Sequence, residues 1–345
     1  MKLYAVIGIL AIGALAGCSA SESPQNTATP SGDPLPDTTV TVLVHDSFWL
    51  PDELIATFES EYGVPVEFVP VGDAGALTNH VVLTAGSPTA DAVYGIDNTF
   101  ASRAISAGAL ADYSARTPTS TDPIGNALTA IDFSDVCFNV DLAAFDGDAP
   151  ESFDDLLDPQ YAGLISAPNP ATSSPGLALL LATYATYGDG WSDYWTALRD
   201  QDLKVTASWS DSYFVDFSAP NYGGDYPIVL SYASSPPAEL IDGAPTTRAL
   251  LDTCFRQTEY AGVLAGSDNE VGAQSAIEWL LSDAVQSALP EAMYVYPVST
   301  TASIPDTWLE YAPLSENPVM LEPQTIDAER EALLREWTAI MIDGQ

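Results

Sequence analysis

The sequence predicts an α/β fold of two lobes, in which each lobe is a mostly parallel sheet flanked by helices. Apolar runs rich in β-branched residues alternate with segments of helical period along most of the chain. Roughly 300 residues follow the N-terminal region, which is enough for two substantial cores. Two β-rich segments bracket the middle block, as expected if the backbone leaves one lobe, builds the second and returns.

The first lobe begins with a βαβαβα pattern. Strands are expected at 40–44, 65–69 and 92–96, and helices at 51–62, 75–85 and 99–107, with Asn98 as the cap of the last helix. Ligands of such sheets lie beyond the carboxyl ends of the strands. The residues expected there are His45, Asp46, Ser47, Asp73, Ala74, Asp97 and Asn98, and all of them except Ala74 have polar side chains.

The middle block repeats the alternation. It has expected strands at 136–140, 164–166, 204–206 and 228–232, and expected helices from residue 153, at 175–187 and at 191–199. A strand at 255–263 and helices at 269–281 and 325–341 complete the chain. We therefore assign residues 40–135 and 256–345 to lobe one and 136–255 to lobe two, with two crossing strands near 135–141 and 255–262.

The N-terminus has the pattern of an export signal. Lys2 precedes an apolar run, Leu3 to Ala16, that is too short to span a bilayer and ends in Leu15-Ala16-Gly17-Cys18, which resembles a lipobox. Residues 1–17 are thus predicted to be a signal peptide, and Cys18 to carry a lipid. The alternative is an ordinary signal peptide with an incidental cysteine. Residues 18–39, rich in Ser, Thr, Pro and Asp, should form a disordered tether. The protein would be exported and lipid-anchored to the outer face of the cell membrane, or periplasmic.

The composition excludes several classes of function. The formal charge is −39, from 9 basic and 48 acidic residues, so nucleic acid and anionic membrane surfaces are disfavoured partners. The acidity serves solubility, or attracts a cationic solute. Only two histidines and no CxxC pair are present, so no metal site is expected. Cys137 and Cys254 fall at the two predicted crossings of an exported chain; they form either a disulfide, which we favour, or two buried thiols.

The segment from Asn169 to Gly176 precedes an apolar helix. Pro175 suits the first helical position, with Ser174 as N-cap and Ser173 beside it. Free N–H groups and hydroxyls at a helix start suit a phosphate. The alternative is that Ser174 only caps its own helix.

Aromatic residues gather near the predicted strand ends. Any single aromatic is more commonly part of a core. Their shared location nevertheless favours a flat or cationic ligand. The residues are Phe48, Trp49, Trp209, Tyr213, Tyr232, Tyr294 and Tyr296.

Several segments, in order from Val40 to the last helix, resemble the thiamine-binding proteins of bacterial ABC importers. They are His45-Asp46-Ser47-Phe48, Gly72-Asp73, Gly95-Ile96-Asp97-Asn98, Pro170 to Leu177, Trp209-Ser210-Asp211-Ser212-Tyr213, Leu230 to Pro236 (which includes Ser235) and Tyr296-Pro297-Val298. The resemblance implies a type II-like periplasmic-binding-protein fold with two crossing hinge strands. It also implies capture of thiamine or a thiamine phosphate by a monomer without a cofactor, and delivery to a membrane permease driven by an ATPase.

The resemblance also implies roles for single residues. The loop 172–176, with Asp73 and Ala74 opposite, would lie near the phosphate, while His45, Trp209, Tyr232 and Tyr294 would surround the rings. The family often has Tyr at the position of His45, Trp at Tyr294 and another aromatic at Ala238. These departures leave the affinity and the preferred phosphorylation state open.

Two other classes of function remain as alternatives. A binding protein of the same fold for ferric iron, a polyamine or an inorganic anion is the first, although iron binders typically use adjacent tyrosines, and Ala233 follows Tyr232 here. A secreted serine hydrolase is the second, but the sequence contains no GxSxG elbow. The sequence therefore predicts a binding protein and not an enzyme.

Overall fold

The computed structural model describes Leu35 and residues 38–344, except positions 116, 118, 146 and 148. The predicted signal peptide (1–17), the lipobox Cys18 and nearly all of the predicted tether lie outside the described residues. Within the described part of the chain, no helix combines the length and the apolar character that a membrane span needs.

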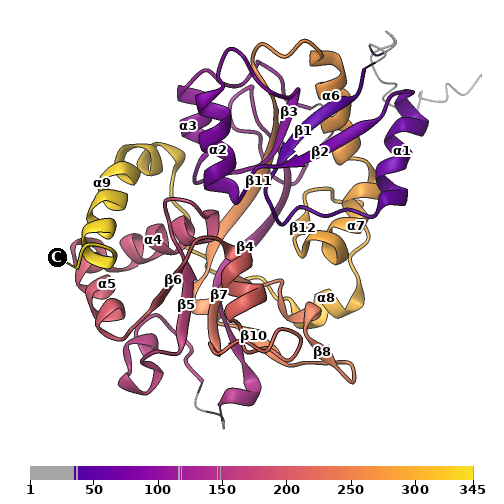
Figure 1. The fold of residues 1–345 in the computed structure, drawn as a ribbon. Helices are drawn as coiled ribbons and strands as arrows, with labels where there is room; N and C mark the ends of the chain where they lie inside the picture. Colours follow the sequence, from indigo (N-terminus) through magenta and orange to yellow (C-terminus); the bar gives the residue numbers. More distant parts are fainter. Residues whose placement is uncertain are drawn as a thin grey trace, which may run out of the picture. The chain divides into compact units, whose positions relative to one another are not determined.

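Strands and helices alternate as the sequence predicts (Figure 1). The strands are β1 Val40–Val44, β2 Val66–Pro70, β3 Ala92–Asp97, β4 Thr129–Asp141, β5 Ile165–Pro168, β6 Lys204–Thr206, β7 Ile228–Tyr232, β8 Leu240–Ile241, β9 Ala244–Pro245, β10 Thr247–Ala249, β11 Phe255–Val263 and β12 Tyr296–Pro297. The helices are α1 Asp52–Tyr62, α2 Ala74–Leu83, α3 Ala101–Ser106, α4 Ser174–Tyr187, α5 Trp191–Asp200, α6 Glu270–Leu280, α7 Asp283–Met293, α8 Asp306–Tyr311 and α9 Pro323–Met341.

One ten-stranded sheet runs through both lobes, in the order β2-β1-β3-β11-β4-β7-β5-β6, with β10 and β12 also paired to β4. The outer strands of each lobe are parallel, whereas β4 and β11 are antiparallel to their neighbours. β11 pairs with β3 and with the first half of β4, and the last residues of β4 pair with β7. The two long strands thus connect the lobe sheets that the sequence predicts separately, and β4 begins at Thr129, earlier than expected.

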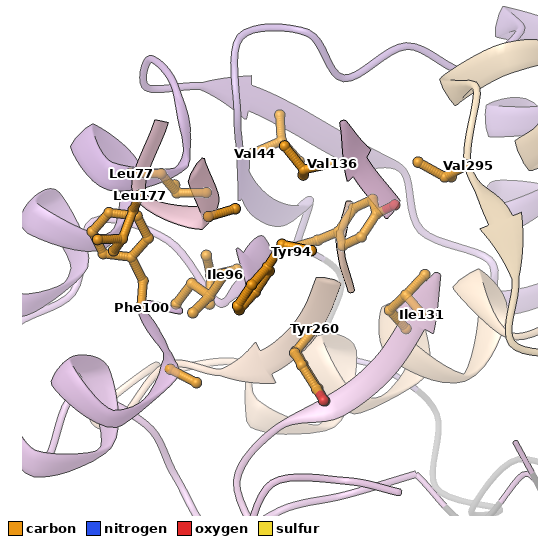
Figure 2. Close-up of a cluster of buried hydrophobic side chains, with 14 of the residues drawn as sticks. Val44, Leu77, Tyr94, Ile96, Phe100, Ile131, Val136, Leu177, Tyr260 and Val295 are labelled. Carbon is orange, nitrogen blue, oxygen red and sulfur yellow. The ribbon is translucent and has the colours of Figure 1, made fainter. Parts of the chain in front are cut away.

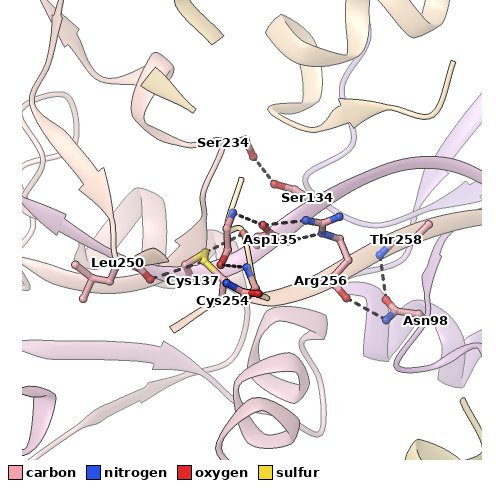
Figure 3. Close-up of polar contacts among 11 residues, drawn as sticks. Asn98, Ser134, Asp135, Cys137, Ser234, Leu250, Cys254, Arg256 and Thr258 are labelled. Carbon is pink, nitrogen blue, oxygen red and sulfur yellow. Dashed lines mark hydrogen bonds and ion pairs between the residues drawn. A yellow bond between two sulfur atoms is a disulfide. The ribbon is translucent and has the colours of Figure 1, made fainter. Parts of the chain in front are cut away.

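The crossing strands are tied together where they leave lobe one (Figure 3). Cys137 and Cys254 form a disulfide, with 4.3 Å between their Cα atoms. Beside it, the Arg256 guanidinium donates to the fully buried Asp135 carboxylate. A buried charge is tolerated when it is paired in this way. These contacts hold β4 and β11 together where both strands pass between the lobes.

Three local predictions are wrong, and helix α7 is missing from the prediction. Asn98 does not cap α3: its side chain bonds Arg256 O and Thr258 N–H of β11, while Asp97 accepts the N–H groups of Thr99 and Phe100. The N-cap of α4 is Ser173, not Ser174. The helix expected from residue 153 is instead two short 3-10 turns, of which the second begins at Pro159. α7 had not been predicted, because Pro290 lies inside it.

The apolar core is continuous between the lobes (Figure 2). Leu177 of α4 packs beside Leu77 of α2 and Phe100, and all three side chains are buried. Each buried side chain of this size contributes about 1.5–3 kcal/mol. The start of α4 is therefore held against lobe one by packing as well as by polar contacts.

The C-terminal helix α9 contacts both lobes, although the sequence places residues 256–345 in lobe one. Trp337 meets Trp195 of α5 edge to face, with 5.7 Å between ring centroids. On the other side, the Arg330 guanidinium lies 6.0 Å from the Phe100 ring centroid. α9 thus bridges α5 and α3 (Figure 1).

Candidate functional site

A cavity of about 280 Å³ lies at the strand ends, between residues of both lobes. It is lined by His45, Ser47, Trp49, Asp73, Ala74, Ser174, Pro175, Trp209, Phe214, Tyr232, Glu259, Glu291, Ala292, Met293, Tyr294 and Val295. No lysine or arginine is among the described residues that line it. We call the lobe-one residues His45, Asp73, Glu259 and Glu291 the acidic wall, and the lobe-two residues Trp209, Phe214 and Tyr232 the aromatic wall.

The acidic wall is built where strands end. His45 directly follows β1, and Gly95 of β3 has a φ of 105° and no side chain because a Cβ there would collide with the His45 ring. His45 Nδ1 lies 2.9 Å from Ser47 Oγ, and its Nε2 lies 3.4 Å from Glu259 Oε2. These two facing atoms are buried and too poorly aligned to count as a hydrogen bond, so both retain capacity for a ligand.

The charges of this wall interact strongly. Burial lowers the pKa of His45, but the carboxylates of Glu259, Asp73 and Asp46 together more than offset this, so that the pKa is raised overall. Burial also raises the pKa of Asp97 to about 6, against the hydroxyl that Ser174 donates to it. An acidic cavity next to buried acids favours a cation as the ligand.

Asp73 joins the two lobes. Its carboxylate accepts the N–H groups of Ala74 (2.6 Å) and Trp209 (2.9 Å) and, at 3.4 Å, that of Ser174. Burial raises its pKa, and the Trp209 N–H opposes this. Ser173 Oγ lies near enough to Asp73 to lower that pKa, yet forms no well-aligned hydrogen bond. A carboxylate thus stands at the N-termini of α2 and α4, where anions are stabilised.

The aromatic wall is a stack of rings. Trp209 follows β6 and stacks on Tyr213 with 5.1 Å between centroids and 17° between planes. Its indole N–H donates to Ser231 Oγ, and Tyr232 meets it edge to face at 5.8 Å. Trp209 is only half-buried and Phe214 is 45% exposed, so these rings offer surface to the cavity.

The third side of the cavity is the end of α7. Tyr294 has a φ of 54°, in the left-handed region that non-glycine residues rarely adopt. Ser234 Oγ of lobe two donates to its carbonyl at 2.6 Å, and Met293 Sδ accepts the Trp49 N–H at 3.1 Å. A strained backbone at a cavity is typical of a functional residue.

The structure divides the predicted site residues into two groups. Those in the cavity lining are His45, Ser47, Asp73, Ala74, Ser174, Trp209, Tyr232 and Tyr294. Those outside it are Asp46, which is exposed, Asn98, which is half-buried, and Asp97, Ser173, Tyr213 and Ser235, which are buried. Several of the second group support the first: Tyr213 stacks under Trp209, and Ser235 Oγ bonds Ser231 Oγ at 2.8 Å.

Sequence reasoning missed three kinds of lining residue. Glu259 lies in the middle of β11 and not at a strand end. It is the one acidic residue of this strand, and an acid in a predicted buried strand is a signal for a buried charge. Glu291, Ala292 and Met293 belong to the unpredicted helix α7. Phe214 lies in the π-helical segment Asp211–Asp216, and such segments are frequent at functional sites.

Within the described residues, no group of three or more His, Cys, Asp or Glu side chains is arranged to hold a metal ion.

Comparisons with known proteins support the fold and show what the chain is similar to. The family model described as bacterial extracellular solute-binding protein matches residues 87–239. The structure of iron-bound HitA from Pseudomonas aeruginosa superposes with a TM-score of 0.69 at 20% identity, over 87% of this chain and 99% of that chain. At that identity the likeness shows the fold alone. The chain has the two-lobed periplasmic-binding-protein fold that the sequence predicted, and its matched segment is similar to bacterial extracellular solute-binding proteins.

Within this class, the chain is similar over most of its length to thiamine-binding proteins. The thiamine-binding periplasmic protein of Escherichia coli (strain K12) is 26% identical over 316 residues, which cover 86% of this chain and 92% of that protein. A solved periplasmic thiamin binding protein superposes with a TM-score of 0.80 at 25% identity, over 88% of this chain and 96% of that chain. The resemblance that the sequence motifs indicated is confirmed.

Proposed function

We propose that this chain is the solute-binding protein of an ABC importer that captures thiamine and delivers it to a membrane permease driven by an ATPase. The observation that carries the proposal is the pairing of an acidic wall with an aromatic wall across one cavity, whose described lining residues include no lysine or arginine. Thiamine carries a permanent positive charge in a flat ring. An aromatic face and a nearby carboxylate replace the water around such a ring.

In the structure, the Asp73 carboxylate lies at the helix start where the sequence suggested that a phosphate would bind. Asp73 accepts the first N–H of α4 and Asp97 accepts the Ser174 hydroxyl, so carboxylates already occupy both donors of Ser174, while the Ser173 hydroxyl has no hydrogen-bond partner. A phosphate at this helix end would have to displace Asp73. Unphosphorylated thiamine is therefore the preferred ligand of the proposal, and it should bind at least as tightly as its phosphates.

The cellular setting completes the proposal. Export by the predicted signal peptide and a lipid on Cys18 would hold a monomer at the outer face of the membrane, within reach of the permease. Acylation of Cys18 is readily checked by mass spectrometry of the membrane fraction. A Cys18→Ser protein that remained acylated and membrane-bound would contradict it.

Titration calorimetry with thiamine, its monophosphate and its diphosphate tests the ligand. We expect saturable 1:1 binding of thiamine, with ferric iron, a polyamine and inorganic phosphate as comparison ligands that do not compete with it. Binding of one of these with no response to thiamine would replace the proposed function by that of a same-fold binding protein for another solute.

A further inference from the structure

Three buried acids form a row across the floor of the cavity. Glu259 of β11 pairs in register with Asp97 of β3 on one side and with Asp132 of β4 on the other. Residues directly opposite on neighbouring strands project to the same face of a sheet. Asp97 and Asp132 are fully buried, and Glu259 is 7% exposed. We call Asp97, Glu259 and Asp132 the acid row.

The acid row is short of positive charge. Among the described residues, no lysine or arginine pairs with any of its members, and His45 is the one cationic partner, at 3.4 Å from Glu259. Asp97 accepts hydroxyl groups from Thr99 and Ser174 and the N–H groups of Thr99 and Phe100, and Asp132 accepts the Tyr94 hydroxyl at 2.5 Å. These donors carry no charge and cannot neutralise three carboxylates at this depth. Some of these acids must therefore hold protons when the cavity contains no cation.

Glu259 connects the row to the cavity. Its Oε1 accepts a hydrogen bond from Gln257 at 3.1 Å, but its buried Oε2 has no hydrogen-bond partner, and the residue lines the cavity. The other titratable groups near the row are His45 after β1, Asp73 at the start of α2, Tyr94 of β3, Tyr232 of β7 and Tyr260 of β11, and Asp46 acts on His45 and Asp73.

We propose that the bound thiazolium cation is neutralised by Glu259, and that its arrival expels a proton from His45 and the acid row, so that cation and proton exchange at the site. This inference rests on the proposed function. The exchange is noncovalent: one positive charge enters the cavity, and about one proton passes to the solvent. Glu259 becomes a specificity-determining residue that no strand-end motif marks.

The direction of the pH dependence follows from the charges. Burial, and then the charge of Glu259, raises the pKa of Asp132 well above its usual value, and Glu259 likewise raises that of His45 against burial. A bound cation lowers all of these pKa values, because it favours the carboxylates and disfavours the imidazolium. Affinity for the cation must then increase as pH rises, and it must fall as Asp97 is protonated near and below its pKa of about 6.

Calorimetry of thiamine binding in buffers of different ionisation enthalpy measures this exchange. Between about pH 6 and 8 the wild-type protein should release roughly 0.5–1 proton per ligand. Glu259→Gln keeps the shape and the bond to Gln257, yet should lower the affinity about tenfold or more and abolish most of the release, since it also removes the charge that holds the protons. Glu53→Gln, an equal change of charge in the exposed first turn of α1, should leave both quantities unchanged.

The outcomes separate the inference from the function beneath it. Thiamine bound with no proton release, or with proton uptake, overturns the inference and leaves the proposed function standing. A folded Glu259→Gln protein, judged by its melting temperature, that binds and releases protons as the wild type does also overturns it. Failure of the wild-type protein to bind thiamine would overturn the proposed function itself. The wild-type proton count decides the exchange even if the variant does not fold.

Discussion

The two walls of the cavity differ in what they contribute. The acidic wall of lobe one holds Asp73, Glu259, Glu291 and His45, whereas the aromatic wall of lobe two holds Trp209, Phe214 and Tyr232. The carboxylates attract any cation whatever its shape, and the aromatic faces contact any flat ring whatever its charge. Neither wall alone would therefore be selective for a charged flat ring. The difference teaches that recognition requires both lobes, which only a closed cavity brings together.

The largest expected effect concerns the disulfide that joins the two crossing strands. Replacing Cys137 and Cys254 by serine opens a loop of 117 residues in sequence separation and should lower the free energy of unfolding by about 3–5 kcal/mol. Thiamine affinity of the folded protein should stay the same, because neither cysteine lines the cavity. Chemical denaturation and calorimetry measure the two quantities. Free thiols in the denatured, unreduced wild-type protein would contradict the disulfide itself.

The next effect tests the aromatic wall. Trp209→Ala should weaken thiamine binding at least tenfold, since cation–π contact is worth roughly 2 kcal/mol when desolvated. Trp209→Phe keeps a ring and should lose less. Thermal melting shows whether each variant is folded, and ligand quenching of tryptophan fluorescence in the parent reports on the same ring. A folded Trp209→Ala protein with normal affinity would remove this residue from the site.

The smallest effect concerns Tyr294, at the edge between the walls. Because its backbone is left-handed, Tyr294→Gly should be more stable than Tyr294→Ala by about 1 kcal/mol. Both variants lack the ring and should lose affinity by the same few-fold factor. Unfolding and binding measured on the pair separate strain from recognition. Equal stability of the two variants would contradict the strained backbone, and unchanged affinity would contradict a role of the ring.

Much of the fold could be predicted from short-range pattern. The largely apolar runs of β1 and β7 predicted the observed bounds, because strands that are buried on both faces are almost continuously apolar. The start of β4 could not be found in this way, since Asp132, Ser134 and Asp135 are buried polar residues whose partners lie in distant parts of the chain. Helix α7 was not predicted, because Pro290 lies inside it and proline normally interrupts a helix.

The site was predictable where strand ends determine it, and not elsewhere. His45, Asp73, Trp209 and Tyr232 follow strands or cap the helix after one, and the structure places them in one cavity. Glu259 depends instead on the register of β11 between β3 and β4, which no local motif specifies. The acidic wall was therefore only partly visible in the sequence, while the aromatic wall was almost complete.

A crystal structure of the protein with thiamine tests the central claim most directly. The account predicts the ligand inside the cavity, with the thiazolium ring within about 6 Å of the Trp209 or Tyr232 ring centroid and turned toward the carboxylate of Glu259. Thiamine bound outside the cavity, or with its thiazolium facing away from both walls, would contradict the account.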